Sequence, residues 1–179
     1  MSSNTLEDLK SVFWNMSQMA LKGIITENPE KWIRKMYPTN GAPDWTVRDN
    51  IVFLNLDSRD DDYGKQRDTT YRAAIGTTLK RSRRTRVWDL TAVCYGPRAY
   101  DMATAFQDGV FTEKIRAYLG KNSVYLVPLL QNPVQSNEIF AGKWWERWNI
   151  TLTFNERYDI TEDVGYYDKV TIIPKADYL

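Results

Sequence analysis

The sequence contains no histidine and only one cysteine, and both shortages restrict the chemistry open to it. The lack of histidine excludes Ser-His-Asp and Cys-His catalysis, histidine-ligated metal centres and the usual proton-transfer group near neutral pH. With Cys94 as the only thiol, neither an intrachain disulfide nor a cysteine-based zinc site can form. Catalysis by carboxylates or lysine stays open, but it is less expected.

The chain also has almost no net charge and few long apolar runs. The chain has 24 Lys and Arg against 23 Asp and Glu, a formal charge of +1, which gives no global attraction to nucleic acid or to an anionic membrane. Its first 23 residues contain early acidic residues and no uninterrupted apolar run, so they predict neither a signal peptide nor a membrane span. We expect a soluble protein that matures in a cytoplasm, without a membrane partner.

Helical periodicity is clearest at the N-terminus. Within residues 1–23, apolar residues recur at three- and four-residue spacing, with Asn4 or Thr5 as the expected cap and Gly23 as the stop. A shorter helix is expected from Pro29 to about Lys35. Residues 97–120 predict a longer helix. Its apolar stripe changes phase near the middle, at Gly109.

Strand patterns dominate residues 50–96 and 124–173. The predicted strands are Asn50–Asp57, Arg67–Gly76, Thr85–Gly96, Ser123–Leu130, the stretch from Trp148 onward, and Tyr166–Pro174. The turn-rich segment Tyr37–Trp45 is expected to be a loop. The polar segments 58–66 and 77–84 are expected to be exposed, charged connections between antiparallel strands. A single α+β domain over residues 1–179 follows, with a mostly antiparallel sheet flanked by helices.

Aromatic residues gather in the stretch AGKWWERWNITLTFNERYDI, residues 141–160. From Trp148 onward, the even positions are mainly apolar, as in a strand with one buried face. The predicted core residues on this face are Trp148, Ile150, Leu152 and Phe154. Trp145 falls on the opposite, polar face, where either a covering helix or another subunit accounts for it. A bulge is expected near Trp144.

Acidic residues cluster after the first strand, at Asp57, Asp60, Asp61 and Asp62. A calcium loop needs alternating oxygen ligands, a central glycine and a terminal glutamate, and that pattern is absent. Three cations among residues 59–67 also neutralise the cluster. We expect a solvated loop, or a loop that pairs between subunits, and no metal site.

Five cations occur within seven residues in KRSRRTR, at Lys80, Arg81, Arg83, Arg84 and Arg86. Next to Trp88, this stretch is the one segment suited to strong phosphate binding. A hairpin edge protected by charge has the same composition. Two interpretations stay open: a solvated or protein-contacting hairpin, and a nucleic-acid-binding surface.

Catalytic motifs are missing elsewhere. The stretch GKQRDTT lacks the upstream glycine of a Walker loop. Glu146 and Glu156 share strand parity, but ten residues of strand separate them by roughly 33 Å, too far for a glycosidase pair at roughly 5 to 9.5 Å. We expect no enzyme, no catalytic residue and no cofactor.

Four segments are informative as a set because of their order along the chain: YPTNGAPDW, TRVWDLTAVCYGPRAYD, VYLVP and GKWWERWNITLTFNE. They span Tyr37–Glu156, about two thirds of the chain. Together they resemble the neck or tail terminator proteins of tailed bacteriophages. The run Gly142–Arg147, followed by Phe154–Glu156, is the most specific part of the resemblance.

The resemblance implies a structural virion protein without enzymatic activity and with a tail-terminator-like fold. Such proteins cap the head-proximal end of the tail tube, typically as a hexameric ring, and bind the head connector above it. DNA passes through the opening without sequence-specific binding. The implied partners are other copies of the chain, the tail tube protein and head connector or neck proteins. The implied location is the virion neck, assembled in the host cytoplasm.

Two other functions stay open besides that of a tail terminator. Within the virion, the chain is a head-tail connector or stopper bound to the portal; from a different class, it is a single-stranded nucleic-acid-binding module. For a ring, the expected contact residues are Trp145, Arg147, Asp60, Asp61, Asp62, Arg81, Arg83 and Arg84. Because translocating DNA should slide, the three arginines at 81, 83 and 84 are expected at a protein contact or rim, away from the opening.

Overall fold

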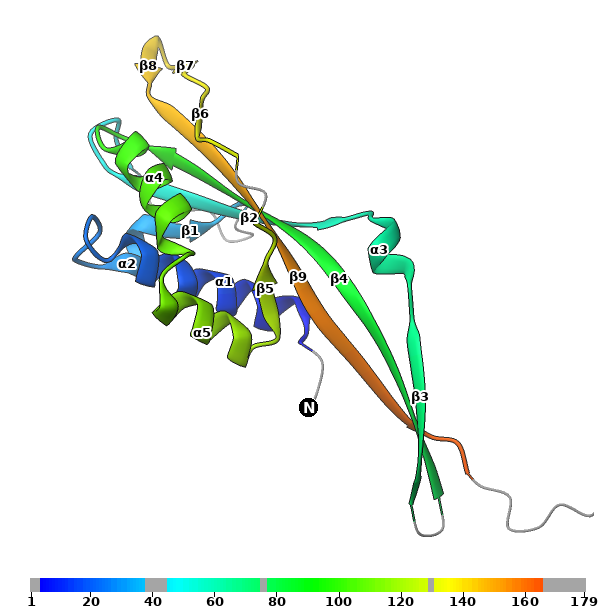
Figure 1. Cartoon of the computed structure of the whole chain (residues 1–179). Helices are drawn as coiled ribbons and strands as arrows, with labels where there is room; N and C mark the ends of the chain where they lie inside the picture. The colour runs from blue at the N-terminus through cyan, green and yellow to red at the C-terminus, as the bar shows by residue number, and fades with distance from the viewer. Residues whose placement is uncertain (1–3, 38–44, 75–76, 129–130, 166–179) are drawn as a thin grey trace, which may run out of the picture.

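The computed structural model describes residues 4–37, 45–74, 77–128 and 131–165. Two long antiparallel strands, β4 (Thr77–Tyr95) and β9 (Arg147–Asp163), run through the whole molecule. Helices cover one face of one half of this pair, and the other half projects away from them (Figure 1). The molecule therefore has a packed body and a protruding ribbon.

The main sheet has the strand order β1-β2-β4-β9-β5, with β3 also on β4 and β6 also on β9. Its shorter strands are β1 (Ile33–Lys35), β2 (Ile51–Arg59), β3 (Asp68–Ala74), β5 (Val124–Leu126) and β6 (Val134–Gln135). Only the β1–β2 pair is parallel among the described strands. A separate hairpin joins β7 (Glu138–Phe140) to β8 (Lys143–Trp145). The prediction of an α+β fold with a mostly antiparallel sheet is confirmed.

The described helices are α1 (Leu6–Leu21), α2 (Pro29–Trp32), α3 (Asp62–Lys65), α4 (Ala99–Gly109) and α5 (Glu113–Lys121). Side-chain caps fix the start of two of them, α1 and α3. Thr5 caps α1 in a reciprocal capping box with Asp8. The predicted phase change in residues 97–120 is a complete break between α4 and α5. No helix of the described residues is long and apolar enough to span a membrane.

The core lies between the sheet and helices α1, α4 and α5. It contains the predicted residues Ile150, Leu152 and Phe154 of β9 and the matching face of β4, while the predicted core residue Trp148 is only partly buried and packs against it. The largest buried side chains include Phe13 and Phe106. The rings of Phe13 on α1 and Phe154 on β9 lie 4.9 Å apart. Burying one such side chain stabilises the fold by about 1.5–3 kcal/mol. The alternation seen in the sequence therefore identifies the core face correctly.

Two expectations about backbone structure are wrong. Residues 77–84 are not a connection: they are the first part of β4, paired with β3 on one side and with β9 on the other. The helix expected from Pro29 to about Lys35 ends at Trp32, because Ile33–Lys35 instead pair with β2. In both cases long-range strand pairing overrides the local pattern.

Other boundaries differ in smaller ways. The strand expected at residues 123–130 is described as three residues, and the bulge expected near Trp144 is the β7–β8 hairpin. Most of the predicted loop Tyr37–Trp45 and all of the predicted strand Tyr166–Pro174 lie outside the described residues.

Candidate assembly surfaces

The protruding ribbon, here called the arm, consists of Asp68–Ala74 of β3, Thr77–Thr85 of β4 and Arg157–Asp163 of β9. Helices α1, α4 and α5 do not extend over it (Figure 1). Tyr71 and Ile160 on the arm are 66% and 45% exposed. A ribbon of this kind has little apolar core of its own, and such strands need further packing to be stable in water.

The basic stretch of the sequence lies in the arm, and acidic residues of β9 neutralise most of it. Asp159 accepts hydrogen bonds from Arg81 and, at 2.8 Å, from Arg83. Lys80 lies 3.3 Å from Glu162 on the facing strand. The cations that look like a phosphate-binding cluster in the sequence are therefore largely paired within the chain.

Among the described residues, the guanidinium group of Arg84 contacts an aromatic ring and no carboxylate, unlike those of its neighbours Arg83 and Arg86. It stacks 5.2 Å from the centre of the Tyr158 ring, and Arg86 approaches the same ring to 4.2 Å. The Nε atom of Arg84 is buried without a hydrogen-bond partner in the described residues. This cation–π arrangement stabilises the arm next to its junction with the body.

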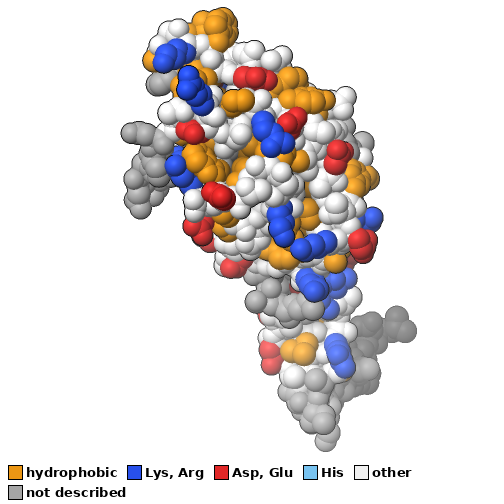
Figure 2. All heavy atoms as spheres, turned by 90° about the vertical axis from the view of Figure 1, so that its left-hand side faces the viewer, with side chains coloured by type: hydrophobic (Ala, Val, Ile, Leu, Met, Phe, Trp, Pro, Cys, Tyr) orange, Lys and Arg blue, Asp and Glu red, His pale blue; other side chains and the backbone are white. Residues whose placement is uncertain are grey.

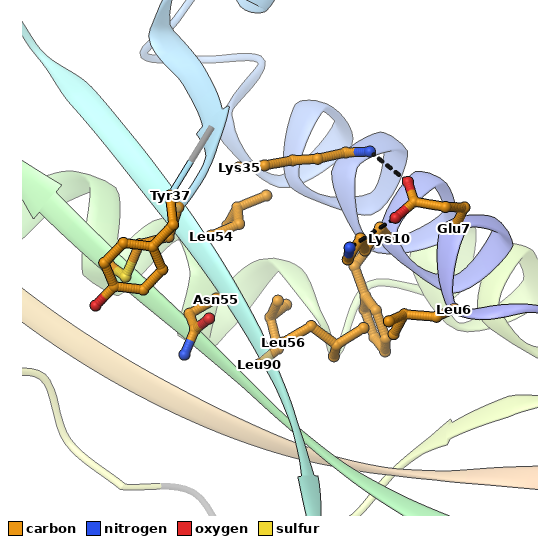
Figure 3. A pocket seen from close by; sticks show the side chains of 11 residues that line it. Leu6, Glu7, Lys10, Lys35, Tyr37, Leu54, Asn55, Leu56 and Leu90 are labelled. Carbon is orange, nitrogen blue, oxygen red and sulfur yellow. Dashed lines mark hydrogen bonds and ion pairs between the residues drawn. The ribbon is translucent and has the colours of Figure 1, made fainter. Parts of the chain in front are cut away.

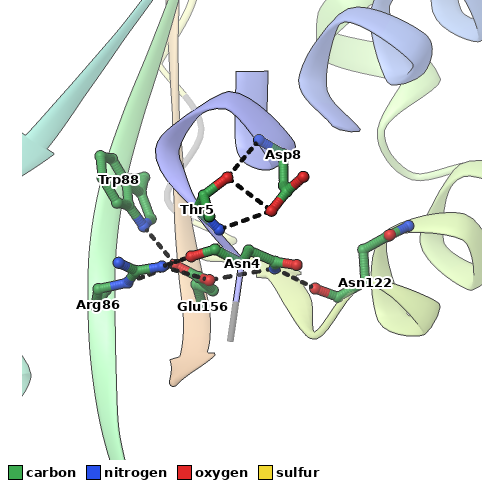
Figure 4. Close-up of polar contacts among 7 residues, drawn as sticks. All are labelled: Asn4, Thr5, Asp8, Arg86, Trp88, Asn122 and Glu156. Carbon is green, nitrogen blue, oxygen red and sulfur yellow. Dashed lines mark hydrogen bonds and ion pairs between the residues drawn. The ribbon is translucent and has the colours of Figure 1, made fainter. Parts of the chain in front are cut away.

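A buried carboxylate, Glu156, joins the arm to the body (Figure 4). Its side chain is 0% exposed and accepts two 2.8 Å hydrogen bonds from Arg86. It also accepts one from Trp88 Nε1 at 2.9 Å and one from Asn4 Nδ2 at 3.2 Å. Arg86 in turn donates to the Asn4 carbonyl at 2.8 Å. The network fixes the direction of the arm relative to the start of α1.

The sequence excludes Glu156 as half of a glycosidase pair and includes it in the family resemblance, but it does not predict a buried ion pair there. One signal was present: it continues the even, apolar side of β9. A carboxylate at a buried position requires a charged partner. The partner, Arg86, lies directly opposite it in register, which the sequence does not reveal.

The acidic residues Asp60, Asp61 and Asp62 lie in the connection from β2 to β3. Lys65 forms ion pairs of 3.2 Å with Asp60 and 2.9 Å with Asp62, and both carboxylates are well exposed. Asp61 caps α3 by accepting a 2.8 Å hydrogen bond from the Tyr63 backbone. In the described part of the chain, no group of metal-binding residues is found. A role for this loop in contacts between subunits stays a prediction.

Trp145 and Arg147 both make contacts within their own chain. The Trp145 ring lies 4.7 Å from that of Trp45, in a small cluster on the face opposite the main core. Arg147 forms a 3.1 Å ion pair with Glu138 and lies 5.8 Å from the Tyr95 ring. The side chain that points away from this cluster is that of the preceding residue, Trp144, which is 68% exposed. Their role at a subunit interface stays a prediction.

The β7–β8 hairpin carries an exposed apolar pair. Trp144 lies directly opposite Ile139 in strand register, and the two side chains are 68% and 61% exposed. Hydrophobic side chains gather at the upper tip of the molecule in Figure 2, where Figure 1 places this hairpin. We call this pair the knob. The sequence points to Trp145 and not to Trp144, because it does not reveal the hairpin that pairs Trp144 with Ile139.

An open groove of about 580 Å³ lies between α1 and β2 (Figure 3). Its apolar lining includes Leu54, Leu56 and Leu90, and Leu6 at 46% exposure also lines it. Along one side Glu7 forms ion pairs with Lys10 at 2.6 Å and with Lys35 at 3.1 Å. Two lysines thus share one carboxylate, which leaves that wall with a net positive charge.

The ion-pair cluster at Asp159 predicts a pH-dependent stability. Burial opposes ionisation of Asp159, but hydrogen bonds from Arg83 and Arg81 outweigh it and lower its pKa below the ordinary value of 3.8. The stabilisation is therefore complete above pH values near 3.8 and is lost as pH falls through the lower pKa of the folded state. Asp159→Asn is expected to lower the free energy of unfolding at neutral pH by about 1.5–3 kcal/mol.

Urea unfolding of Asp159→Asn and the wild type between pH 7 and pH 3 measures this effect. The difference between the two proteins should shrink toward pH 3. Asp60→Asn is the matched control, because its carboxylate is 86% exposed and an exposed pair contributes at most about 1 kcal/mol. An Asp159→Asn effect that does not change with pH would contradict the assignment.

The arm and the knob expose apolar side chains, and the groove is open, features typical of surfaces that contact other proteins. The sequence profile of the phage neck terminator protein family matches residues 9–177. The chain belongs to this family and is a structural component of the phage neck. Its family implies contacts with other tail and head proteins of the virion. A search of curated proteins found no match to the chain.

Proposed function

We propose that copies of this chain form a ring that closes the head-proximal end of the tail tube and contacts the head connector. Six copies is the number that the family resemblance implies. DNA passes through the opening during ejection without sequence-specific binding, and the protein uses neither a cofactor nor a catalytic residue. The observation that carries the ring is the arm, which extends beyond the helix-covered body and exposes apolar side chains.

The two outer edges of the arm are suited to pairing between copies. Within the described residues, β3 pairs only with β4, and no strand pairs with Ile160–Asp163 on the side away from β4. Unpaired backbone groups at a strand edge form a template for another strand. Because the two edges differ, an edge of β3 on an edge of β9 is a heterologous contact, and repeated rotation closes it into a ring.

The charge of the arm agrees with passage of DNA. Asp159 pairs with Arg81 and Arg83 and so reduces the attraction that a bare basic stretch would exert on phosphate. We expect these arginines and Arg84 at a protein contact or rim. The same pairing weakens the argument for a nucleic-acid-binding module, whose binding would fall steeply with salt.

Native mass spectrometry, light scattering and negative-stain imaging of the purified protein, alone and with tail tube protein, test the proposal. A ring in either sample is expected. Tyr71→Lys on the arm should reduce the assembled fraction, while Phe111→Lys, at a residue 45% exposed after α4, should not. A protein that stays monomeric in both samples would contradict the ring. Binding to portal protein but not to tail tube protein would assign a connector instead.

A further inference from the structure

The knob and the groove are two separate apolar surfaces of one chain, and nothing in the described residues covers either. The knob exposes an aromatic and an aliphatic side chain on the two-stranded hairpin of β7 and β8. Large exposed apolar groups of this kind mark contact sites, and tryptophan is the side chain most enriched at the centre of protein interfaces.

The groove is large enough to hold the two side chains of the knob. A volume of about 580 Å³ lies within the range of about 300–1,000 Å³ found for pockets that enclose small ligands. The groove is open to solvent, so Trp144 with Ile139 of another copy can enter it from outside. The aliphatic part of the lining, which includes Leu54, Leu56 and Leu90, gives an indole ring apolar side chains to pack against.

The charges beside the knob and along the groove also favour contact between the two surfaces. Glu146 follows Trp144 at the end of the hairpin and is exposed, and its side chain accepts a 3.0 Å hydrogen bond from Trp148 Nε1. The groove wall is net positive, since Lys10 and Lys35 share Glu7. Adjacent strand residues face opposite sides, so the exposed Lys143 is on the face of β8 opposite Trp144, and Glu146 would approach the positive rim in this orientation.

We propose that the knob of one copy, Trp144 with Ile139, inserts into the groove between α1 and β2 of the next copy. The inference rests on the proposed ring and names a contact within it. Each copy carries one knob and one groove, so a second copy as the occupant covers both surfaces in equal numbers. A contact between two unlike surfaces repeats around a ring. The knob provides less than half of the roughly 800 Å² per partner of a stable interface, so it acts together with the arm.

Cysteine pairing between copies tests the contact directly. Cys94 is 0% exposed, and burial raises the pKa of its thiol, so the native cysteine does not need to be removed. Protein with Ile139→Cys is mixed with protein carrying Leu6→Cys, and the heterotypic disulfide is measured after mild oxidation. The control mixture replaces Leu6→Cys by Phe111→Cys, whose residue is equally exposed and lies outside the groove.

The Leu6 mixture is expected to give at least about tenfold more heterotypic product than the Phe111 mixture. Trp144→Ala should weaken self-association about tenfold or more, with an unchanged circular dichroism spectrum, as expected for a central tryptophan. Trp144→Phe should restore much of the association. Equal yields in the two mixtures, or an unchanged association of Trp144→Ala, would overturn the contact.

Failure of this contact differs from failure of the ring. If rings form but the Leu6 cross-link does not, the proposed function stands and the contact between knob and groove is wrong. If assembly requires the tail tube, the same two mixtures are oxidised in its presence, and equal yields there overturn the contact. Absence of any assembly, with or without tail tube protein, overturns both proposals.

Discussion

Glu156→Gln is expected to lower the free energy of unfolding by about 3–5 kcal/mol, because removing one partner of a buried ion pair leaves the other charge uncompensated. Arg86 would keep its charge next to a neutral amide, at a position where Glu156 is now 0% exposed. The amide also offers only one acceptor oxygen to the three side chains that now donate to the carboxylate. Urea unfolding followed by tryptophan fluorescence measures the change.

Glu162→Gln is the matched control for this prediction. It lies on the same strand and pairs with Lys80 at 3.3 Å, but its side chain is 59% exposed. An exposed pair contributes about 0–1 kcal/mol, so this variant should unfold almost like the wild type. Similar losses for both variants would show that burial of Glu156 is not the cause.

The loss at Glu156 should also affect assembly beyond its effect on stability. The network ties β4 and β9 to Asn4 before α1 at the point where the arm leaves the body. Without it, the arm is held to the body by fewer contacts and takes a wider range of directions. Association measured under conditions where the variant is fully folded should therefore be weaker than that of the wild type.

Gly96→Ala is expected to lower the free energy of unfolding by about 2–6 kcal/mol, for two reasons that add. Gly96 has φ +107°, a conformation that costs an L residue about 1–3 kcal/mol. An added Cβ would also overlap the Asp49 carbonyl oxygen and lie 2.9 Å from Asn50 Oδ1, and overpacking of this kind costs about 1–3 kcal/mol. Thermal or urea unfolding measures the loss.

Gly142→Ala separates the two reasons. Gly142 also has a positive φ, +71°, but no atom lies within 4 Å of the position of an added Cβ. It should therefore lose only the conformational part, about 1–2 kcal/mol. If both glycines gave the same loss, crowding against Asp49 would not contribute. The comparison matters for the fold because this turn leads from β4 into α4, and Asn50 Oδ1 accepts the Arg98 backbone N–H at 2.9 Å.

The sequence by itself determined those features that depend on neighbouring residues. Alternation along β9 identified Ile150, Leu152 and Phe154 as core, because adjacent strand residues point to opposite faces. Capping chemistry placed the start of α1, and the phase change at Gly109 marked the end of α4. The order of motifs from Tyr37 to Glu156 pointed to the family that the profile match confirms. That the chain is one domain stays a prediction.

Only the tertiary structure decided where distant residues meet. Residues 77–84 read as a charged connection, because the carboxylates of Asp159 and Glu162 that balance Arg83 and Lys80 lie about eighty positions later in the chain. For the same reason the sequence could not place Trp145 against Trp45 and leave Trp144 exposed. Local patterns fix which face of a strand is apolar, whereas strand register fixes which charges are paired and which aromatic side chains stay available for a partner.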